Sequence, residues 1–150
     1  MKKIIITVLL LLAIIRSNSQ TGPISWNFSV NKLTNKTYEV HIKATVEEGW
    51  HVFSTVQPVD ALPMPTTIKF GRSPMIMLSG KIKEIGIMKK VKEPALNTSS
   101  NQYERSVDFI QLVKKKGGVK THITGSVNFQ ACTNEKCLPP KTVSFNLPLE

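Results

Sequence analysis

Apolar and polar side chains alternate without interruption in Thr37–Val46, "TYEVHIKATV". Tyr38, Val40, Ile42, Ala44 and Val46 form one set, and the residues between them form the other. Successive side chains of a β-strand point to opposite faces, so this period of two predicts a strand with one buried face. No segment after the N-terminal apolar run shows the 3.6-residue spacing of a capped amphipathic helix. We therefore expect an all-β chain.

Further strand-like segments follow at short intervals. They are Ser25–Val30, Trp50–Ser54, Thr66–Phe70, Lys81–Met88, Tyr103–Val113, Val119–Ala131 and Lys141–Leu147. Clusters of Gly, Pro, Asn or Ser separate them, at Pro58–Pro65, Gly71–Pro74, Asn97–Asn101 and Gly117–Gly118. Seven or eight short strands with this punctuation predict an immunoglobulin-like antiparallel β-sandwich.

The N-terminal segment predicts export. Lys2 and Lys3 precede an apolar run, Ile4–Ile15, and small residues follow it. This pattern is typical of a secretory signal peptide, which we place at residues 1–19, leaving one domain at residues 20–150. A bilayer-spanning helix needs about twenty apolar residues, more than this run contains. We expect a periplasmic protein with no stable membrane insertion after signal removal.

The positive charge does not predict nucleic-acid binding. The formal charge is +10, and it falls to +7 when Lys2, Lys3 and Arg16 leave with the signal peptide. The remaining lysines are scattered along the chain, whereas a nucleic-acid interface needs basic and aromatic residues clustered on one face. The charge favours solubility or attraction to an anionic partner.

The only two cysteines lie in "FQACTNEKCLPP", at Cys132 and Cys137. The four residues between them are rich in turn formers, so the cysteines are expected to flank a hairpin connection and face each other. Directly opposed residues that form a non-hydrogen-bonded pair have Cα atoms about 4.5 Å apart, which allows a disulfide. Closing so short a loop contributes only about 2 kcal/mol. Lys136, next to Cys137, would favour a thiolate.

These residues by themselves leave three interpretations open: a structural disulfide, a redox-active pair and a metal site. The metal site is the least supported. None of the three histidines, His41, His51 and His122, has a recognisable zinc-ligand spacing from the cysteines.

Two motifs in order along the chain carry a resemblance to a known family. "GWHVFS" at Gly49–Ser54, followed by "PMPTTIKF", and then "FQACTNEKCLPP" resemble the N-terminal periplasmic domain of the thiol:disulfide interchange protein DsbD. The resemblance runs from about Trp26 to Leu147. Because this chain stops at Glu150, without the membrane region of that family, it resembles a stand-alone homologue.

The resemblance implies a protein-disulfide reductase component with an immunoglobulin-like fold. Such a domain takes reducing equivalents from the thioredoxin-like domain of a membrane thiol reductase. It passes them to oxidised periplasmic proteins such as disulfide isomerases or cytochrome-maturation proteins. By position, Cys137 matches the cysteine that forms the mixed disulfide, and Cys132 matches the resolving one. No cofactor and no metal are implied.

The resemblance also predicts a cap over the cysteines, which is aromatic in well-known members. Here Leu96 lies at about that place, with Tyr103 further on. Trp50 is expected to fill the core, and His51 is a candidate for tuning the thiols. The alternative function is an exported β-sandwich binding module whose disulfide is purely structural, and a copper or zinc carrier is a third possibility.

Overall fold

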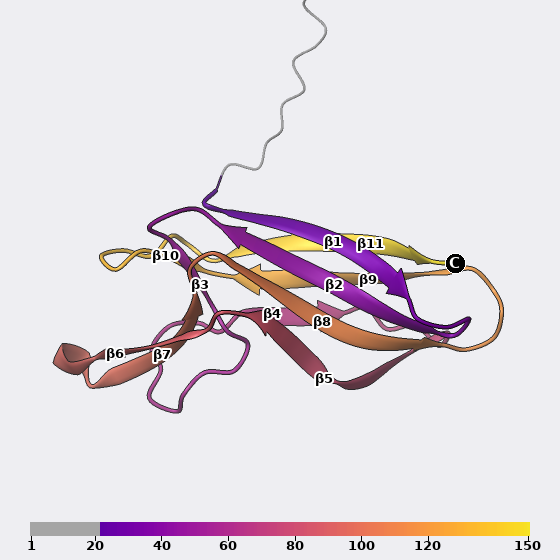
Figure 1. The fold of residues 1–150 in the computed structure, drawn as a ribbon, viewed down its shortest axis with the longest axis horizontal. Coiled ribbons are helices and arrows are strands. Elements are labelled where there is room, and N and C mark those ends of the chain that lie inside the picture. The colour runs from indigo at the N-terminus through magenta and orange to yellow at the C-terminus, as the bar shows by residue number, and fades with distance from the viewer. Residues whose placement is uncertain (1–21) are drawn as a thin grey trace, which may run out of the picture.

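The computed structural model describes residues 22–150, so the predicted signal peptide lies outside the described residues. The described chain is all-β with antiparallel sheets and forms an immunoglobulin-like sandwich, as expected from the alternation (Figure 1). The elements in chain order are β1 (Ile24–Lys32), β2 (Thr37–Val46), β3 (His51–Phe53), β4 (Thr67–Phe70), β5 (Ile76–Gly86), β6 (Lys89–Glu93), the 3₁₀ turn η2 (Pro94–Leu96), β7 (Thr98–Tyr103), β8 (Ser106–Lys115), β9 (Thr121–Phe129), β10 (Ala131–Cys132) and β11 (Lys141–Leu149).

Two sheets form the body of the sandwich. One has the strand order β1-β2-β8-β5 and the other β11-β9-β4. The apolar face predicted for β2 is fully buried between them, with Tyr38, Val40, Ile42 and Ala44 at most 1% exposed. The Trp26 ring centroid lies 6.1 Å from that of Phe109 and 5.1 Å from that of Phe129. Burial of these large apolar surfaces is the main stabilising contribution to the fold.

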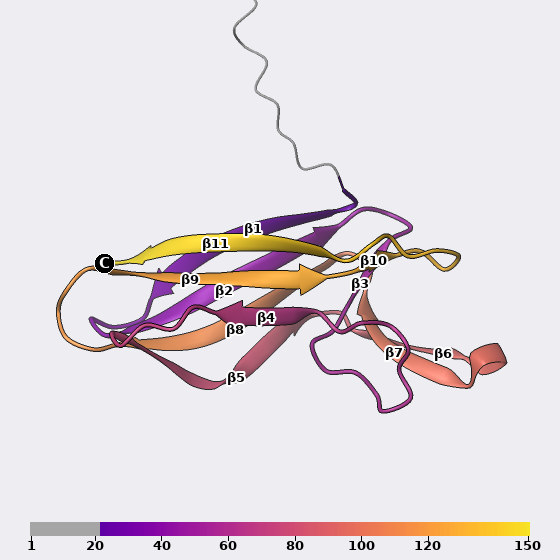
Figure 2. The same cartoon turned by 180° about the vertical axis from the view of Figure 1, so that it is seen from behind.

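A third, smaller sheet lies at one end of the sandwich, with the order β10-β3-β7-β6 (Figures 1 and 2). The chain enters it from β2 through a turn at Glu47–Gly49, where Gly49 has a φ of +82°, a conformation that glycine adopts without a steric penalty. Both figures show the η2 turn and the loop after β10 at this end, and the C-terminus at the other. The small sheet therefore carries the cysteine segment.

The predicted strand boundaries are wrong around this small sheet. Asn97–Asn101 was expected to separate strands, but most of it belongs to β7, and β6 pairs with β7 across the η2 turn. Only residues 81–86 of the expected strand Lys81–Met88 belong to β5, which starts at Ile76, ends at Gly86 and has a register shift between Ser79 and Lys83. The polar composition of "NTSSN" suggests a turn, but residues 98–101 are extended in β7, where side chains from the loop after β3 bond to Ser99 and Asn101.

Candidate functional site

The cysteines form a disulfide across a tight hairpin at the end of the small sheet. Their Cα atoms are 4.0 Å apart, and the two residues form an antiparallel bridge. Two main-chain hydrogen bonds flank the pair: Thr133 N–H donates to the Lys136 carbonyl at 2.7 Å, and Leu138 N–H donates to the Ala131 carbonyl at 2.9 Å. The predicted four-residue connection is confirmed.

The cysteine hairpin was expected to connect the strands Val119–Ala131 and Lys141–Leu147 directly, but the structure differs. β9 and β11 pair only as far as Phe129 and Lys141, and the cysteines are not an extension of that ladder. Instead, β10 leaves β9 and pairs with β3, where Cys132 lies opposite His51. Pro139 and Pro140 have no N–H to donate, so the ladder of β11 begins only after them.

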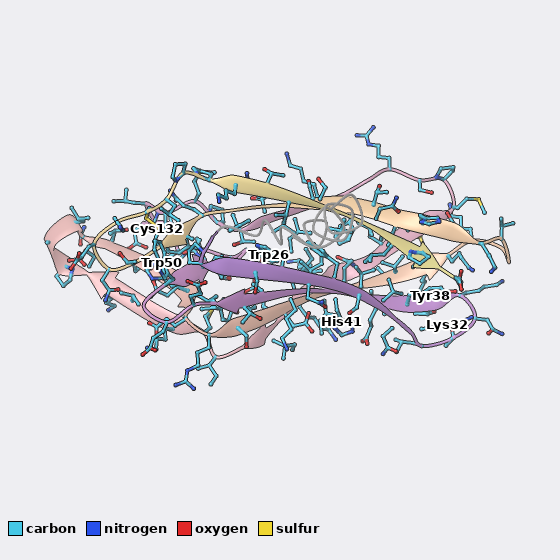
Figure 3. All side chains as sticks on the ribbon, turned by 90° about the horizontal axis from the view of Figure 1, so that it is seen from above. Trp26, Lys32, Tyr38, His41, Trp50 and Cys132 are labelled. Atoms are coloured by element: carbon cyan, nitrogen blue, oxygen red, sulfur yellow. A yellow bond between two sulfur atoms is a disulfide. The ribbon has the colours of Figure 1, made fainter. Side chains whose placement is uncertain are left out.

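The two sulfur-bearing residues differ in exposure. Cys132 is 1% exposed and sits in the interior, whereas Cys137 is exposed to solvent. Figure 3 shows Cys132 and Trp50 at the same end of the molecule, far from Lys32 and Tyr38. Trp50 is half-buried and packs against the core. Cys137 is therefore accessible from solvent, and Cys132 is not.

A groove of about 580 Å³ separates the cysteine hairpin from the β6–η2–β7 hairpin. Both cysteines and the turn between them form one wall, and Leu96 lies in the η2 turn on the opposite side. Leu62 and Pro63, from the loop after β3, complete its apolar lining. The structure thus brings Leu96 to the cysteines, although Leu96 remains 64% exposed and leaves the groove open.

Tyr103, the other candidate for a cap, lies elsewhere. Its side chain is 2% exposed and is not part of the groove lining. Its hydroxyl donates a hydrogen bond to Glu84 at 2.7 Å, and burial together with this carboxylate raises the pKa of Tyr103. Tyr103 therefore has a structural role beneath the small sheet.

His51 lines the same groove as the cysteines and is 7% exposed. Its ring packs edge-on against Phe53, with centroids 5.2 Å apart. Burial lowers the pKa of His51, and the nearby Glu104 carboxylate opposes that shift. Burial therefore favours the neutral form of the imidazole opposite Cys132. Lys136 also lines the groove and is exposed in the turn next to Cys137.

The other histidines do not approach the cysteines. His41 contacts Asp108 at 2.8 Å, and His122 contacts Asn146 at 3.1 Å; neither lines the groove. Within residues 22–150, no group of three or more His, Cys, Asp or Glu side chains is arranged to hold a metal ion.

Glu84 is a supporting residue that the sequence analysis missed. Its carboxylate accepts hydrogen bonds from the Ser54 hydroxyl at 2.7 Å, the Thr55 N–H at 2.8 Å, the Thr55 hydroxyl and the Tyr103 hydroxyl. Ser54 and Thr55 directly follow β3, and Tyr103 is the last residue of β7. The hydrogen bonds of Glu84 therefore connect the small sheet to β5. A single acidic residue within the strand-like run Lys81–Met88 was the only signal in the sequence.

The loop after β3 is held against β7 by side chains in place of a strand ladder. Two hydrogen bonds connect Gln57 and Asn101. The Gln57 side-chain amide donates to the Asn101 main-chain carbonyl at 2.7 Å, and the Asn101 main-chain N–H donates to the Gln57 side-chain oxygen at 3.0 Å. The Asp60 carboxylate accepts from the Ser99 hydroxyl at 2.8 Å. These contacts position Leu62 and Pro63 in the groove.

Comparisons with known proteins support the fold family. No model of a known protein family matches the chain, and no curated protein matches it in sequence. Among solved structures, the N-terminal periplasmic domain of ScsB from Proteus mirabilis is similar, with a TM-score of 0.60 and 14% sequence identity over 86% of this chain. This chain has the fold of these periplasmic domains. It spans about half of the ScsB chain, 47% of its length.

Two solved structures from Neisseria meningitidis are also similar to this chain. The reduced DsbD N-terminal domain has a TM-score of 0.53 and 10% identity, covering 81% of this chain and 83% of its own. The complex of the DsbD and PilB N-terminal domains has a TM-score of 0.51 and 13% identity, covering 86% of this chain and 88% of the matched one. At these identities the likeness concerns the fold. In the described residues, no helix is long and apolar enough to cross a membrane.

Proposed function

We propose that this chain is a periplasmic thiol–disulfide exchange domain that works through Cys132 and Cys137. It would pass reducing equivalents from a membrane-linked thioredoxin-like donor to oxidised periplasmic proteins. The observation that carries this proposal is the unequal exposure of the two cysteines within one disulfide, at the wall of an open groove. A purely structural bridge has no need to present one sulfur to solvent.

The geometry suggests a separate role for each cysteine. In the reduced domain, the exposed Cys137 thiolate attacks one sulfur of a partner disulfide, and the other partner sulfur leaves as a thiolate that takes a proton from solvent. The buried Cys132 thiolate then attacks the Cys137 sulfur. This step releases the reduced partner and forms the Cys132–Cys137 disulfide seen in the structure. The partner gains two electrons and the domain loses two.

The comparisons support a protein as the partner. The matched complex holds a DsbD N-terminal domain together with a PilB N-terminal domain, so a domain of this fold docks onto another protein domain. We propose a thioredoxin-like domain as the donor, and a disulfide isomerase or a cytochrome-maturation protein as the acceptor. The predicted signal peptide at residues 1–19 supports export.

The reduction potential of the cysteine pair separates this function from a structural disulfide. We expect a value above about −300 mV, in the range of exchange-active couples. Reduction should also leave the domain folded, because closing the short loop between residues five apart in sequence contributes at most about 2 kcal/mol. The measurement is a glutathione or dithiothreitol redox titration followed by mass spectrometry. A potential well below −300 mV would favour the exported binding module instead.

Leu96 is proposed to act as a partial cap over the disulfide. Replacing it with alanine should speed reduction by dithiothreitol by roughly two- to fivefold, because exchange depends on access to the attacked sulfur. Leu96→Phe should slow the same reaction. The matched control is Val59→Ala, an exposed apolar residue that does not line the groove. Equal rates for the wild type and both Leu96 variants would show that Leu96 does not shield the sulfurs.

His51 should make stability depend on pH in a defined direction. Its pKa in the folded state is lowered from 6.5, so the unfolded chain binds more protons than the folded one below pH 6.5. The stabilising contribution is therefore present above pH 6.5 and is lost as the pH falls towards the lowered pKa of the folded state. In urea titrations from pH 7.5 to 5, His51→Gln should show a smaller fall in unfolding free energy than the wild type. His122→Gln, at an exposed position, should follow the wild type.

A further inference from the structure

Cys137 presents free main-chain groups beside its sulfur. The two hydrogen bonds of the hairpin connect Thr133 with Lys136 and Leu138 with Ala131, and therefore flank the cysteine pair. In an antiparallel ladder, residues of such a pair direct their own N–H and C=O groups away from each other. No described residue bonds the outward N–H and C=O of Cys137.

Cys132 has the same geometry but no free groups. Its outward N–H and C=O face β3, where Cys132 is paired with His51. The small sheet therefore continues from β3 through β10 to the Cys137 segment, which is its outermost strand. The disulfide connects this edge segment to the strand inside it.

The free edge at Cys137 is short. The Leu138 carbonyl points inward and accepts a hydrogen bond from the Gln130 side chain at 3.1 Å. Pro139 and Pro140 have no N–H, so the edge cannot extend a ladder beyond Cys137 in that direction. On the other side, the Lys136 N–H donates to the Thr133 hydroxyl within the turn. Cys137 is thus a single-residue pairing position.

We propose that this edge docks the reacting cysteine of the partner through its main chain. The occupant is an extended cysteine-containing segment of the partner protein, with its cysteine directly opposite Cys137. The two cysteines would exchange N–H···O=C bonds in both directions. Directly opposed residues in such a hydrogen-bonded pair have Cα atoms about 5.5 Å apart, within the Cα range of disulfides, and their Cβ atoms must approach to about 4.5 Å for the bond to form. This inference rests on the proposed function.

The arrangement also orients the exchange reaction. Directly opposed side chains lie on the same face of a sheet, and neighbouring strands are about 4.8 Å apart. The partner sulfur, Cys137 and Cys132 would therefore form a row across three adjacent strands. When the Cys132 thiolate attacks the Cys137 sulfur, the Cys132–Cys137 bond forms, and the bond from Cys137 to the partner breaks on the opposite side. The partner sulfur leaves as a thiolate.

Main-chain pairing makes docking largely independent of the partner's side chains. Every extended segment offers one N–H and one C=O at its cysteine, so proteins with unrelated sequences can bind in the same way. The groove containing Leu62 and Leu96 would then contribute the apolar contacts. Docking through main-chain pairing at Cys137 and apolar contacts in the groove suits a domain that reduces several different proteins.

N-methylated peptides test the pairing directly. The Cys132→Ser variant, which keeps Cys137 as its single thiol, is equilibrated with the disulfide of the peptide acetyl-Ala-Cys-Ala-amide, and the mixed disulfide is quantified by mass spectrometry. Methylating the cysteine nitrogen removes the N–H that would donate to Cys137, and should lower the equilibrium constant by roughly three- to tenfold, the net effect of one hydrogen bond. Methylating the nitrogen of the following alanine, which points away from Cys137, should change it less than twofold.

Parallel equilibration of each peptide with 2-mercaptoethanol corrects for intrinsic differences between the peptides. Equal corrected constants for all three peptides would overturn the main-chain docking while leaving the exchange function intact. If no peptide formed a mixed disulfide with Cys137, the proposed function would fail and the docking with it. A loss confined to the peptide methylated at the cysteine nitrogen would establish the pairing.

Discussion

Cys137→Ser is expected to abolish covalent capture of an oxidised partner, whereas Cys132→Ser should accumulate it. Only Cys137 is exposed, so only its sulfur can be joined to a second protein. Without Cys132, the mixed disulfide has no neighbouring thiolate to resolve it and persists. Incubating each variant with an oxidised thioredoxin-like domain, then running non-reducing gels, should show at least about tenfold more complex for Cys132→Ser than for Cys137→Ser.

The Cys132→Ser/Cys137→Ser double variant is the matched control and should form no complex. Circular dichroism of all three variants checks that each retains the β-sandwich, since one short-loop disulfide contributes little to stability. If Cys137→Ser captured the partner and Cys132→Ser did not, the roles of the two cysteines would be reversed. If neither did so, while both remained folded, the pair would not act by a mixed disulfide.

Removing the Glu84 carboxylate should cause a large loss of stability, although the side chain is only half-buried. Glu84→Ala leaves the Tyr103 hydroxyl, which is buried, and the donors at Ser54 and Thr55 without their acceptor. Hydrogen bonds to charged groups contribute about 1.5–3 kcal/mol each and are not additive within one network, so we expect a loss of roughly 2–4 kcal/mol. Urea denaturation measures it.

Glu48→Ala is the matched control, because Glu48 is exposed in the turn after β2 and should change stability by less than about 0.5 kcal/mol. Glu84→Ala should also alter the exchange rate of the disulfide, because Glu84 connects β5 to the ends of β3 and β7, which carry the groove. A Glu84→Ala variant as stable as the wild type would show that the small sheet is held by other contacts.

The local sequence pattern was sufficient to predict β2, a central strand of the sandwich. The alternation in Thr37–Val46 predicted both the extent of β2 and which of its side chains are buried, because period-two alternation follows directly from strand geometry. The cysteine hairpin was also predictable, since its four-residue connection contains its own turn-forming residues. In both cases the determining interactions lie within a few residues of each other.

The small sheet could not be predicted in the same way. Its strands β3, β6, β7 and β10 have two to six residues each, too few to show a period. "NTSSN" has the composition of a turn, but its last four residues belong to β7, because Gln57 and Asp60, far away in sequence, bond to them. Its conformation depends on tertiary contacts that outweigh local preference.

The sequence by itself determined an all-β domain with a cysteine hairpin, because alternation and turn chemistry act locally along the chain. Only the tertiary structure decided which cysteine is exposed, that Leu96 lines the same groove as the cysteines while Tyr103 supports the sheet, and that Glu84 joins the two parts. These properties depend on segments distant in sequence lying side by side, as with Glu84 and Ser54, whose sequence separation is 30. The hairpin "ACTNEKC" therefore becomes a candidate redox site through its neighbours in space, which bury Cys132 and leave the edge at Cys137 open.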